Sequence, residues 1–184
     1  MPEVISNTSP LLYLYRINAL GWLPELFSEI WIPNAVVLEL REGQKRGYDV
    51  PVPTSTTYPW LKIVEPQLIP TELKLLDLGM GELAALSLAL ETPDRIVLLD
   101  DGLARRAAQA SGLTVWGTLK VLLAAKSEGL TEEINPLIDR LQNSGMWISE
   151  EIRHRILKLA GESSDRSSHP NQSSDSSSPN WLLD

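Results

Sequence analysis

The strongest constraint on the fold of this chain comes from residues 96–102. Ile96-Val97-Leu98-Leu99 is an unbroken run of branched aliphatic residues, and Asp100-Asp101-Gly102 follows it directly. A short continuous apolar run of this kind predicts a strand that is buried on both faces, as in a parallel sheet. In open parallel sheets, ligands bind beyond the carboxyl ends of the strands. The two aspartates are therefore expected at the edge where a site would lie.

Short apolar runs alternate with helical patterns through most of the chain. Further strands are expected at residues 4–6, 30–32 and 114–116, with an edge element at 61–64. A first helix is expected with Ser9 as its N-cap and Pro10 at its first position. Later helices are expected at residues 33–40, 82–91, 103–110, 118–127, 131–142 and 149–160, with a long loop at 43–59. This alternation predicts an α/β fold with a mostly parallel central sheet and helices on both faces.

The composition changes near Glu162. Residues 1–162 are expected to form one domain, since domains commonly contain about 100–200 residues. Residues 163–184 are rich in serine and nearly devoid of apolar side chains before Trp181, which predicts a disordered tail. The tail is either a plain spacer or carries a short docking motif at Trp181-Leu182-Leu183.

Cysteine is absent, so disulfides, thiolate metal sites and a cysteine nucleophile are excluded. No targeting segment is visible, and the apolar stretches are much shorter than the roughly 20 residues that span a bilayer. We therefore expect a cytoplasmic protein without membrane contact. The net charge of −8 disfavours a protein that coats nucleic acid, because such binders carry a basic excess. It disfavours a metallonuclease less, because bound cations there meet the phosphate.

Two more acids, Glu39 and Glu82, lie within apolar helical patterns. An acid among aliphatic residues is costly unless it meets a cation, a donor or water. Together with Asp100 and Asp101, they suit a hard cation such as Mg²⁺ or Mn²⁺. Each also has a simpler interpretation: Glu82 complements a helix dipole, Glu39 is solvated, or Asp101 is only an N-cap. Two adjacent carboxylates make a pure cap less satisfactory for the Asp100–Asp101 pair.

Several stretches resemble PIN-domain proteins, in particular a prokaryotic PIN-like subfamily related to VapC-type toxins. The matching stretches, in order, are Ser6-Asn7-Thr8-Ser9-Pro10-Leu11, residues 32–40, Gly81-Glu82-Leu83-Ala84-Ala85, residues 99–105, Gly117-Thr118 and residues 124–129. The resemblance covers residues 3–162 and implies the PIN-like three-layer fold. It also implies a metal-dependent endoribonuclease for single-stranded RNA, of the kind that acts as the toxin of a toxin–antitoxin pair.

The resemblance assigns roles to individual residues. The catalytic set it implies is Asn7, Glu39, Glu82 and Asp101, and Mg²⁺ or Mn²⁺ would be held by Glu39, Glu82, Asp100 and Asp101. Asn7 stands where most PIN nucleases have aspartate, so it brings an oxygen but no charge. Ser9 either caps the helix or donates near the metal. Apart from the resemblance, Arg105 is expected to pair with Asp101 or Glu82 and fix their orientation, to meet a phosphate, or to form a plain surface pair.

The expected partners are single-stranded RNA, a cognate antitoxin and a second copy of the chain. The homodimer expectation rests on the resemblance and on Trp22, Trp31 and Trp147 in apolar settings. Two other functions stay open. One is a catalytically weak or inactive PIN-like module that binds nucleic acid or protein, which Asn7 and the acidic charge favour. The other is a receiver-like phosphotransfer domain, although its phosphoacceptor would usually follow the first strand, where Asn7 lies.

Overall fold

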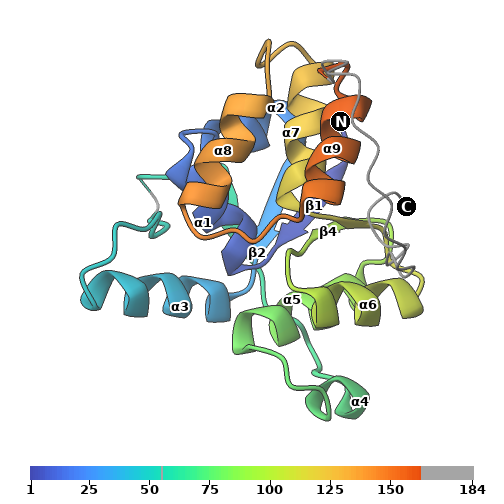
Figure 1. The fold of residues 1–184 in the computed structure, drawn as a ribbon. Coiled ribbons are helices and arrows are strands. Elements are labelled where there is room, and N and C mark those ends of the chain that lie inside the picture. The colour runs from blue at the N-terminus through green and yellow to red at the C-terminus, as the bar shows by residue number, and fades with distance from the viewer. Residues whose placement is uncertain (55, 163–184) are drawn as a thin grey trace.

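A five-stranded sheet forms the centre of the computed structural model, which describes residues 1–54 and 56–162 (Figure 1). Its strands are β1 (Glu3–Ser6), β2 (Glu29–Ile32), β3 (Leu61–Ile63), β4 (Ile96–Leu98) and β5 (Val115–Trp116). Their order is β3-β2-β1-β4-β5, and every neighbouring pair is parallel. The expected α/β fold is confirmed, and each strand begins and ends within one residue of its predicted bounds. The predicted disordered tail lies outside the described residues.

Helices cover both faces of this sheet. One face carries α1 (Thr8–Arg16), α7 (Thr118–Ser127), α8 (Asn135–Asn143) and α9 (Glu150–Leu159), and the other carries α5 (Met80–Glu91) and α6 (Gly102–Ala110). Helix α3 (Asn34–Lys45) packs against both α1 and α5, so it bridges the two layers, and Figure 1 shows it beside α5. The short elements are η1 (Leu20–Trp22), α2 (Leu23–Leu26) and α4 (Thr71–Lys74).

Strand β4 shows why the sheet is buried on both sides. Ile96 and Leu98 join the core formed with α1 and α7, whereas Val97 and Leu99 join the core formed with α5 and α6. All four side chains are at most 8% exposed. Successive residues of a strand point to opposite faces, so an unbroken aliphatic run is what a sheet between two helical layers requires.

Several predicted boundaries are wrong, each for a local reason. Ser9 is not the N-cap: α1 begins at Thr8, Asn7 holds the N-cap position, and Pro10 is the third helical residue. The N–H groups in the first turn of a helix have no acceptor within the helix. Proline, which lacks an N–H, therefore fits the third helical position as well as the first. Helix α3 runs on to Lys45, and the last expected helix before α9 begins at Asn135 instead of Thr131.

The long loop after α3 is partly packed. Within the stretch predicted as a loop, residues 43–45 still belong to α3, and Val50 and Val52 lie against the core of α1 and α7. The three short elements η1, α2 and α4 have no counterpart in the sequence prediction. Within residues 1–54 and 56–162, no helix is long and apolar enough to cross a membrane.

The parallel arrangement brings several helix N-termini to one edge of the sheet. Helices α1, α3, α6 and α7 each begin one or a few residues after β1, β2, β4 and β5 respectively. The N-terminus of a helix carries partial positive charge and unpaired N–H groups. This edge therefore favours acidic side chains, and the predicted site residues lie on it or next to it.

Candidate functional site

Glu39 is a half-buried residue of α3 that connects three helices. Thr8 Oγ1, at the start of α1, donates to one of its carboxylate oxygens. The backbone N–H of Gly81, at the start of α5, donates to the other at 2.7 Å. A Cβ atom on Gly81 would lie 2.6 Å from Glu39 Oε2, so glycine is what leaves the carboxylate its place against α5. The solvated alternative for Glu39 is therefore wrong.

Glu82 lies one residue further along α5 and accepts a hydrogen bond from Gly79 N–H at 2.9 Å. This contact satisfies an N–H at the helix start, which agrees with the simpler interpretation of Glu82. Burial raises the pKa of Glu82 above its ordinary value; the Gly79 N–H lowers it, and the negative charges of Asp101 and Glu39 raise it again. The three carboxylates therefore share one field, although they come from three separate segments.

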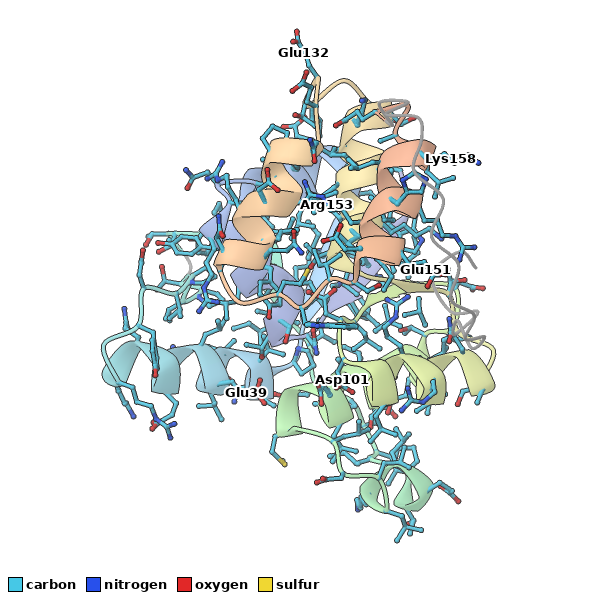
Figure 2. The ribbon with its side chains drawn as sticks, viewed as in Figure 1. Glu39, Asp101, Glu132, Glu151, Arg153 and Lys158 are labelled. Carbon is cyan, nitrogen blue, oxygen red and sulfur yellow. The ribbon has the colours of Figure 1, made fainter. Side chains whose placement is uncertain are left out.

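Asp101 is the N-cap of α6. One of its carboxylate oxygens accepts from the backbone N–H groups of Leu103 and Ala104 at 2.8 and 2.9 Å. The capping interpretation is therefore confirmed, and the side chain is nevertheless exposed toward a cleft. Figure 2 shows Glu39 and Asp101 on the same side of the molecule, near α5, with Arg153 and Lys158 of α9 above them.

Asp100 makes different contacts from its neighbour. Its two carboxylate oxygens accept from the backbone N–H and the hydroxyl of Thr118, at 2.8 and 2.7 Å, so Asp100 fixes the start of α7. Burial raises the pKa of Asp100, while the two bonds from Thr118 and the positive charge of Arg105 oppose that shift. Thr118 is fully buried, and no role was predicted for it.

Arg105 is 4% exposed and lies beside Asp100. Its Nη1 donates to Leu99 O at 2.8 Å. A Cβ on Gly117 would come within 2.9 Å of Arg105 Nη1 and 3.1 Å of Asp100 Oδ1, so glycine leaves room for both side chains. Burial lowers the pKa of Arg105, and Asp100 opposes this shift. The charge of Arg105 thus compensates Asp100 directly, a pairing that was not among the predicted ones.

Asn7 is the one catalytic candidate without a carboxylate. It is 1% exposed, and its Oδ1 accepts no hydrogen bond from any described residue. Buried polar atoms without a partner are rare and call for a specific explanation, such as a bound water or ion. Asn7 directly precedes Thr8 in the sequence, and Thr8 donates to Glu39. Asn7 is therefore the sequence neighbour of a residue that contacts one of the candidate acids.

A cleft of about 550 Å³ opens beside these residues. Glu82, Asp100, Asp101 and Arg105 line it together with Ser9, whereas Asn7 and Glu39 do not line it. Ser9 is therefore present at the site even though its capping role is wrong. In residues 1–54 and 56–162, no group of three or more acidic or histidine side chains is close enough to hold a metal ion.

The donor chemistry still fits a hard divalent cation. All the candidate ligands are oxygens, which Mg²⁺ and Mn²⁺ prefer. The Oδ1 atom of Asn7 has no hydrogen-bond partner in the part of the chain that the structure describes. A cation near Glu82 would also reverse the effect that burial and neighbouring charges have on its pKa. Glu39, Glu82 and Asp101 need to move closer together to share one ion.

The acids were predictable from the sequence, but the residues that hold them were not predicted. Thr8 and Thr118 are the clearest omissions, since each donates a hydroxyl to a predicted site residue. Both directly follow a strand end, at Ser6-Asn7 and Trp116-Gly117. That position was the available signal, because side chains just after parallel strands gather at one edge.

The fold and this edge define an α/β domain with acidic residues at the carboxyl ends of a parallel sheet. Residues 3–162 match a protein family described as the PIN domain. The chain therefore belongs to the PIN domain family, and its fold is of the nuclease type. None of the curated proteins compared with the chain matches it.

Proposed function

We propose that this chain is a divalent-metal-dependent endoribonuclease that cleaves single-stranded RNA and acts as the toxin of a toxin–antitoxin pair. One observation carries the proposal. The carboxylate of Glu82 lies in the field of Asp101 and Glu39, which come from two other segments, and Asn7, the residue before the Thr8 that donates to Glu39, buries an amide oxygen without a hydrogen-bond partner among the described residues. On a nuclease-type fold, such an arrangement fits a cation that meets phosphate.

Each residue has a distinct part in this proposal. Glu39, Glu82 and Asp101, with Asn7, hold the cation, and Asp100 and Arg105 position the start of α7 beside them. When bound, Mg²⁺ or Mn²⁺ supplies Lewis acidity toward the scissile phosphate and makes water a better nucleophile. The hydrogen bonds from Thr8, Gly79 and Gly81 hold the carboxylates in place. No nucleophilic protein side chain is required.

The test is cleavage of a single-stranded RNA by purified Glu82→Gln and Asp101→Asn proteins with Mn²⁺ or Mg²⁺. Cleavage by the wild type should stop when a chelator is added, and both variants should lose at least about 100-fold in rate, since each loses charge on the cation. Both should keep the fold. Glutamine can still accept from Gly79 N–H, and asparagine is a good N-cap for α6.

Glu132→Gln is the matched control. Glu132 is an exposed acid that Figure 2 shows at the opposite end of the molecule from Glu39 and Asp101. The Glu132→Gln substitution removes the same charge as Glu82→Gln and should leave cleavage unchanged. The metal-free Glu82→Gln protein should be as stable as the wild type or more so, because repulsion with Asp101 and Glu39 is relieved. Full metal-dependent cleavage by both site variants would place the active site elsewhere.

A second candidate function is a PIN-like module that binds nucleic acid or a protein without cutting. Among the described residues, no three acidic side chains lie close enough together to hold a metal ion, which favours binding without cleavage. The neutral side chain of Asn7 favours it as well. RNA binding that is unchanged by a chelator, together with no cleavage under any metal, would support this function over the nuclease.

We also propose two protein partners, a cognate antitoxin and a second copy of the chain. Among the tryptophans on which the homodimer expectation rested, Trp147 is 82% exposed. Trp31 is half-buried and lies under the guanidinium of Arg95 at 3.4 Å, so it supports the fold instead. Light scattering of the protein alone, and after co-expression with the product of the adjacent gene, tests both partners. A monomer in both samples contradicts them.

A further inference from the structure

The cleft beside the acids has a second wall that the proposed chemistry does not use. Glu82, Asp100 and Asp101 line one side. The other side is apolar and comes from α7, from α9 and from the loop that joins α8 to α9. Its apolar residues are Leu119, Leu123, Met146, Trp147, Ile148, Ile152 and Ile156.

Most of this apolar wall belongs to the core. Leu119, Ile148 and Ile156 are at most 9% exposed, so they offer little surface to a ligand. Trp147 is the opposite case, since it is 82% exposed. Trp147 is therefore the most exposed apolar side chain of the wall, since Leu123, Met146 and Ile152 are half-buried, and burying its ring would be favourable because apolar surface is removed from water.

The loop that carries Trp147 is held firmly. Met146 N–H donates to Leu141 O at 3.0 Å, and Gln142 Nε2 donates to Ile148 O at 3.2 Å, on the two sides of the tryptophan. Arg153 of α9 then holds Gln142 by donating to its Oε1 at 2.7 Å. The indole is thus presented on a fixed support, and binding to it costs little ordering of the loop.

The overall charge favours an aromatic contact as a source of affinity for a nucleic-acid ligand. The chain carries a net charge of −8, and one wall of the cleft is acidic. Phosphate contacts with basic side chains, which supply most non-specific affinity for nucleic acid, are therefore limited here. Contacts with bases add affinity that does not depend on this charge, and every unpaired base offers a face that stacks on an aromatic ring.

We propose that Trp147 is a stacking platform for one unpaired nucleobase of the substrate strand, next to the phosphate at the acidic wall. This proposal rests on the proposed nuclease function. A peptide helix is a poorer occupant, because helices in grooves use several apolar anchors along one face. The wall offers one exposed ring, which matches one flat base. Lys120 lines the same wall and lies 5.2 Å from the Trp116 ring.

The experiment measures KM and kcat for a single-stranded RNA with Trp147→Ala and Trp147→Phe proteins in saturating Mg²⁺ or Mn²⁺. Trp147→Ala should raise KM by about 5- to 100-fold, as expected for the loss of one stacked base, with a smaller change in kcat. Trp147→Phe should stay within about 5-fold of the wild type, because phenylalanine keeps an aromatic face. Tyr48→Ala is the matched control, an aromatic residue that is 62% exposed outside this cleft, and should leave KM unchanged.

A set of RNAs with a single abasic nucleotide identifies the base. One position near the cleavage site should weaken binding to the wild type and abolish its advantage over Trp147→Ala. If no position does so, or if both Trp147 variants keep the wild-type KM, the platform is wrong while the nuclease stands. If the wild type does not cleave, the proposed function fails. RNA binding is then compared by fluorescence anisotropy, and equal binding by the wild type and Trp147→Ala rejects the platform as well. Loss of a protein partner by Trp147→Ala, with RNA binding intact, would assign Trp147 to that partner instead.

Discussion

Every acidic side chain at this edge of the sheet already has a donor. Glu39 accepts from Thr8 and Gly81, Asp101 caps α6, and Asp100 accepts from Thr118. Such bonds hold each carboxylate in one orientation. The acids are thus structural and functional candidates at the same time. Substitutions that keep the donors satisfied, such as glutamine or asparagine, separate these two roles.

The identity of these acids was predictable, but their hydrogen-bond partners were not. The run Leu99-Asp100-Asp101 showed that two carboxylates follow a central strand. It could not show that Asp100 turns toward Thr118 whereas Asp101 turns toward α6, because a side-chain direction depends on residues that are distant in sequence. The same holds for Glu39, whose partners lie 31 and 42 residues away.

Asn7→Asp tests the nuclease proposal at a single atom. The added carboxylate should bind Mn²⁺ more tightly and raise the cleavage rate, because hard cations favour charged oxygen ligands. The metal-free variant should be less stable by about 1–3 kcal/mol, since Asn7 is buried and a charge there has no partner. Calorimetric titration with Mn²⁺, chemical unfolding and a cleavage assay on the same protein measure all three quantities.

Asn143→Asp, which adds the same charge at the exposed end of α8, should leave Mn²⁺ affinity unchanged. Tighter metal binding without cleavage by Asn7→Asp would favour the binding module. Unchanged affinity in Asn7→Asp would mean that this side chain does not face the cation.

At the scale of elements, prediction succeeded where a pattern was long or unmistakable. Strands β1, β2, β4 and β5 and helices α5, α6 and α7 lie at or close to their expected bounds, because their apolar runs are clear. Helices η1, α2 and α4 are four residues or fewer, too short to show a period. The start of α1 was misplaced because Asn, Ser and Thr are all good N-caps, and all three occur before Pro10.

Gly81→Ala tests the close approach of α5 to α3. Alanine favours a helix over glycine by about 1 kcal/mol, so the helix itself should gain. Its Cβ would nevertheless lie 2.6 Å from Glu39 Oε2 and push that carboxylate away. We expect cleavage and Mn²⁺ affinity to fall by about 10-fold or more while the free energy of unfolding changes by less than about 1 kcal/mol.

Gly43→Ala provides the matched helical control. A Cβ there would lie 3.6 Å from Val50 Cγ1, an ordinary contact, so the variant should be slightly more stable and fully active. Calorimetric titration measures the Mn²⁺ affinity of both proteins, and chemical unfolding measures their free energy of unfolding. Wild-type metal affinity in Gly81→Ala would remove Glu39 from the set of ligands.

At the scale of the whole molecule, Glu162 closes the layer of helices that carries the apolar wall of the cleft. Its Oε1 accepts from Lys126 Nζ of α7 at 2.6 Å and from Ile134 N–H at 2.7 Å, and its Oε2 accepts from Asn135 N–H at 2.9 Å. One carboxylate therefore ties the chain beyond α9 to α7 and to the start of α8. Residue 162, at which the domain was expected to end, is the residue that makes this contact.

Shortening the chain to residues 1–162 should leave stability unchanged, whereas replacing Glu162 by glutamine should lower it. The shortened protein should keep the thermal midpoint and the cleavage rate of the full chain, because a serine-rich segment supplies little core. Glu162→Gln in the full chain should lose about 1–3 kcal/mol of unfolding free energy, the usual value of hydrogen bonds to a charged group. Glu128→Gln, at an exposed position after α7, is the control and should lose nothing.

The pH dependence of this loss identifies its cause. Burial raises the pKa of Glu162, but the bonds from Lys126, Ile134 and Asn135 outweigh it, so the pKa lies below its ordinary value of 4.5. A carboxylate with a lowered pKa stabilises the fold above its ordinary pKa, and this contribution disappears as the pH falls through the lowered value. The stability difference between wild type and Glu162→Gln, measured by urea unfolding, should therefore be constant near neutral pH and shrink below about pH 4. A difference that does not change with pH would show that the charge of Glu162 is not responsible. A large loss of stability in the 1–162 protein would instead show that residues after Glu162 dock on the domain.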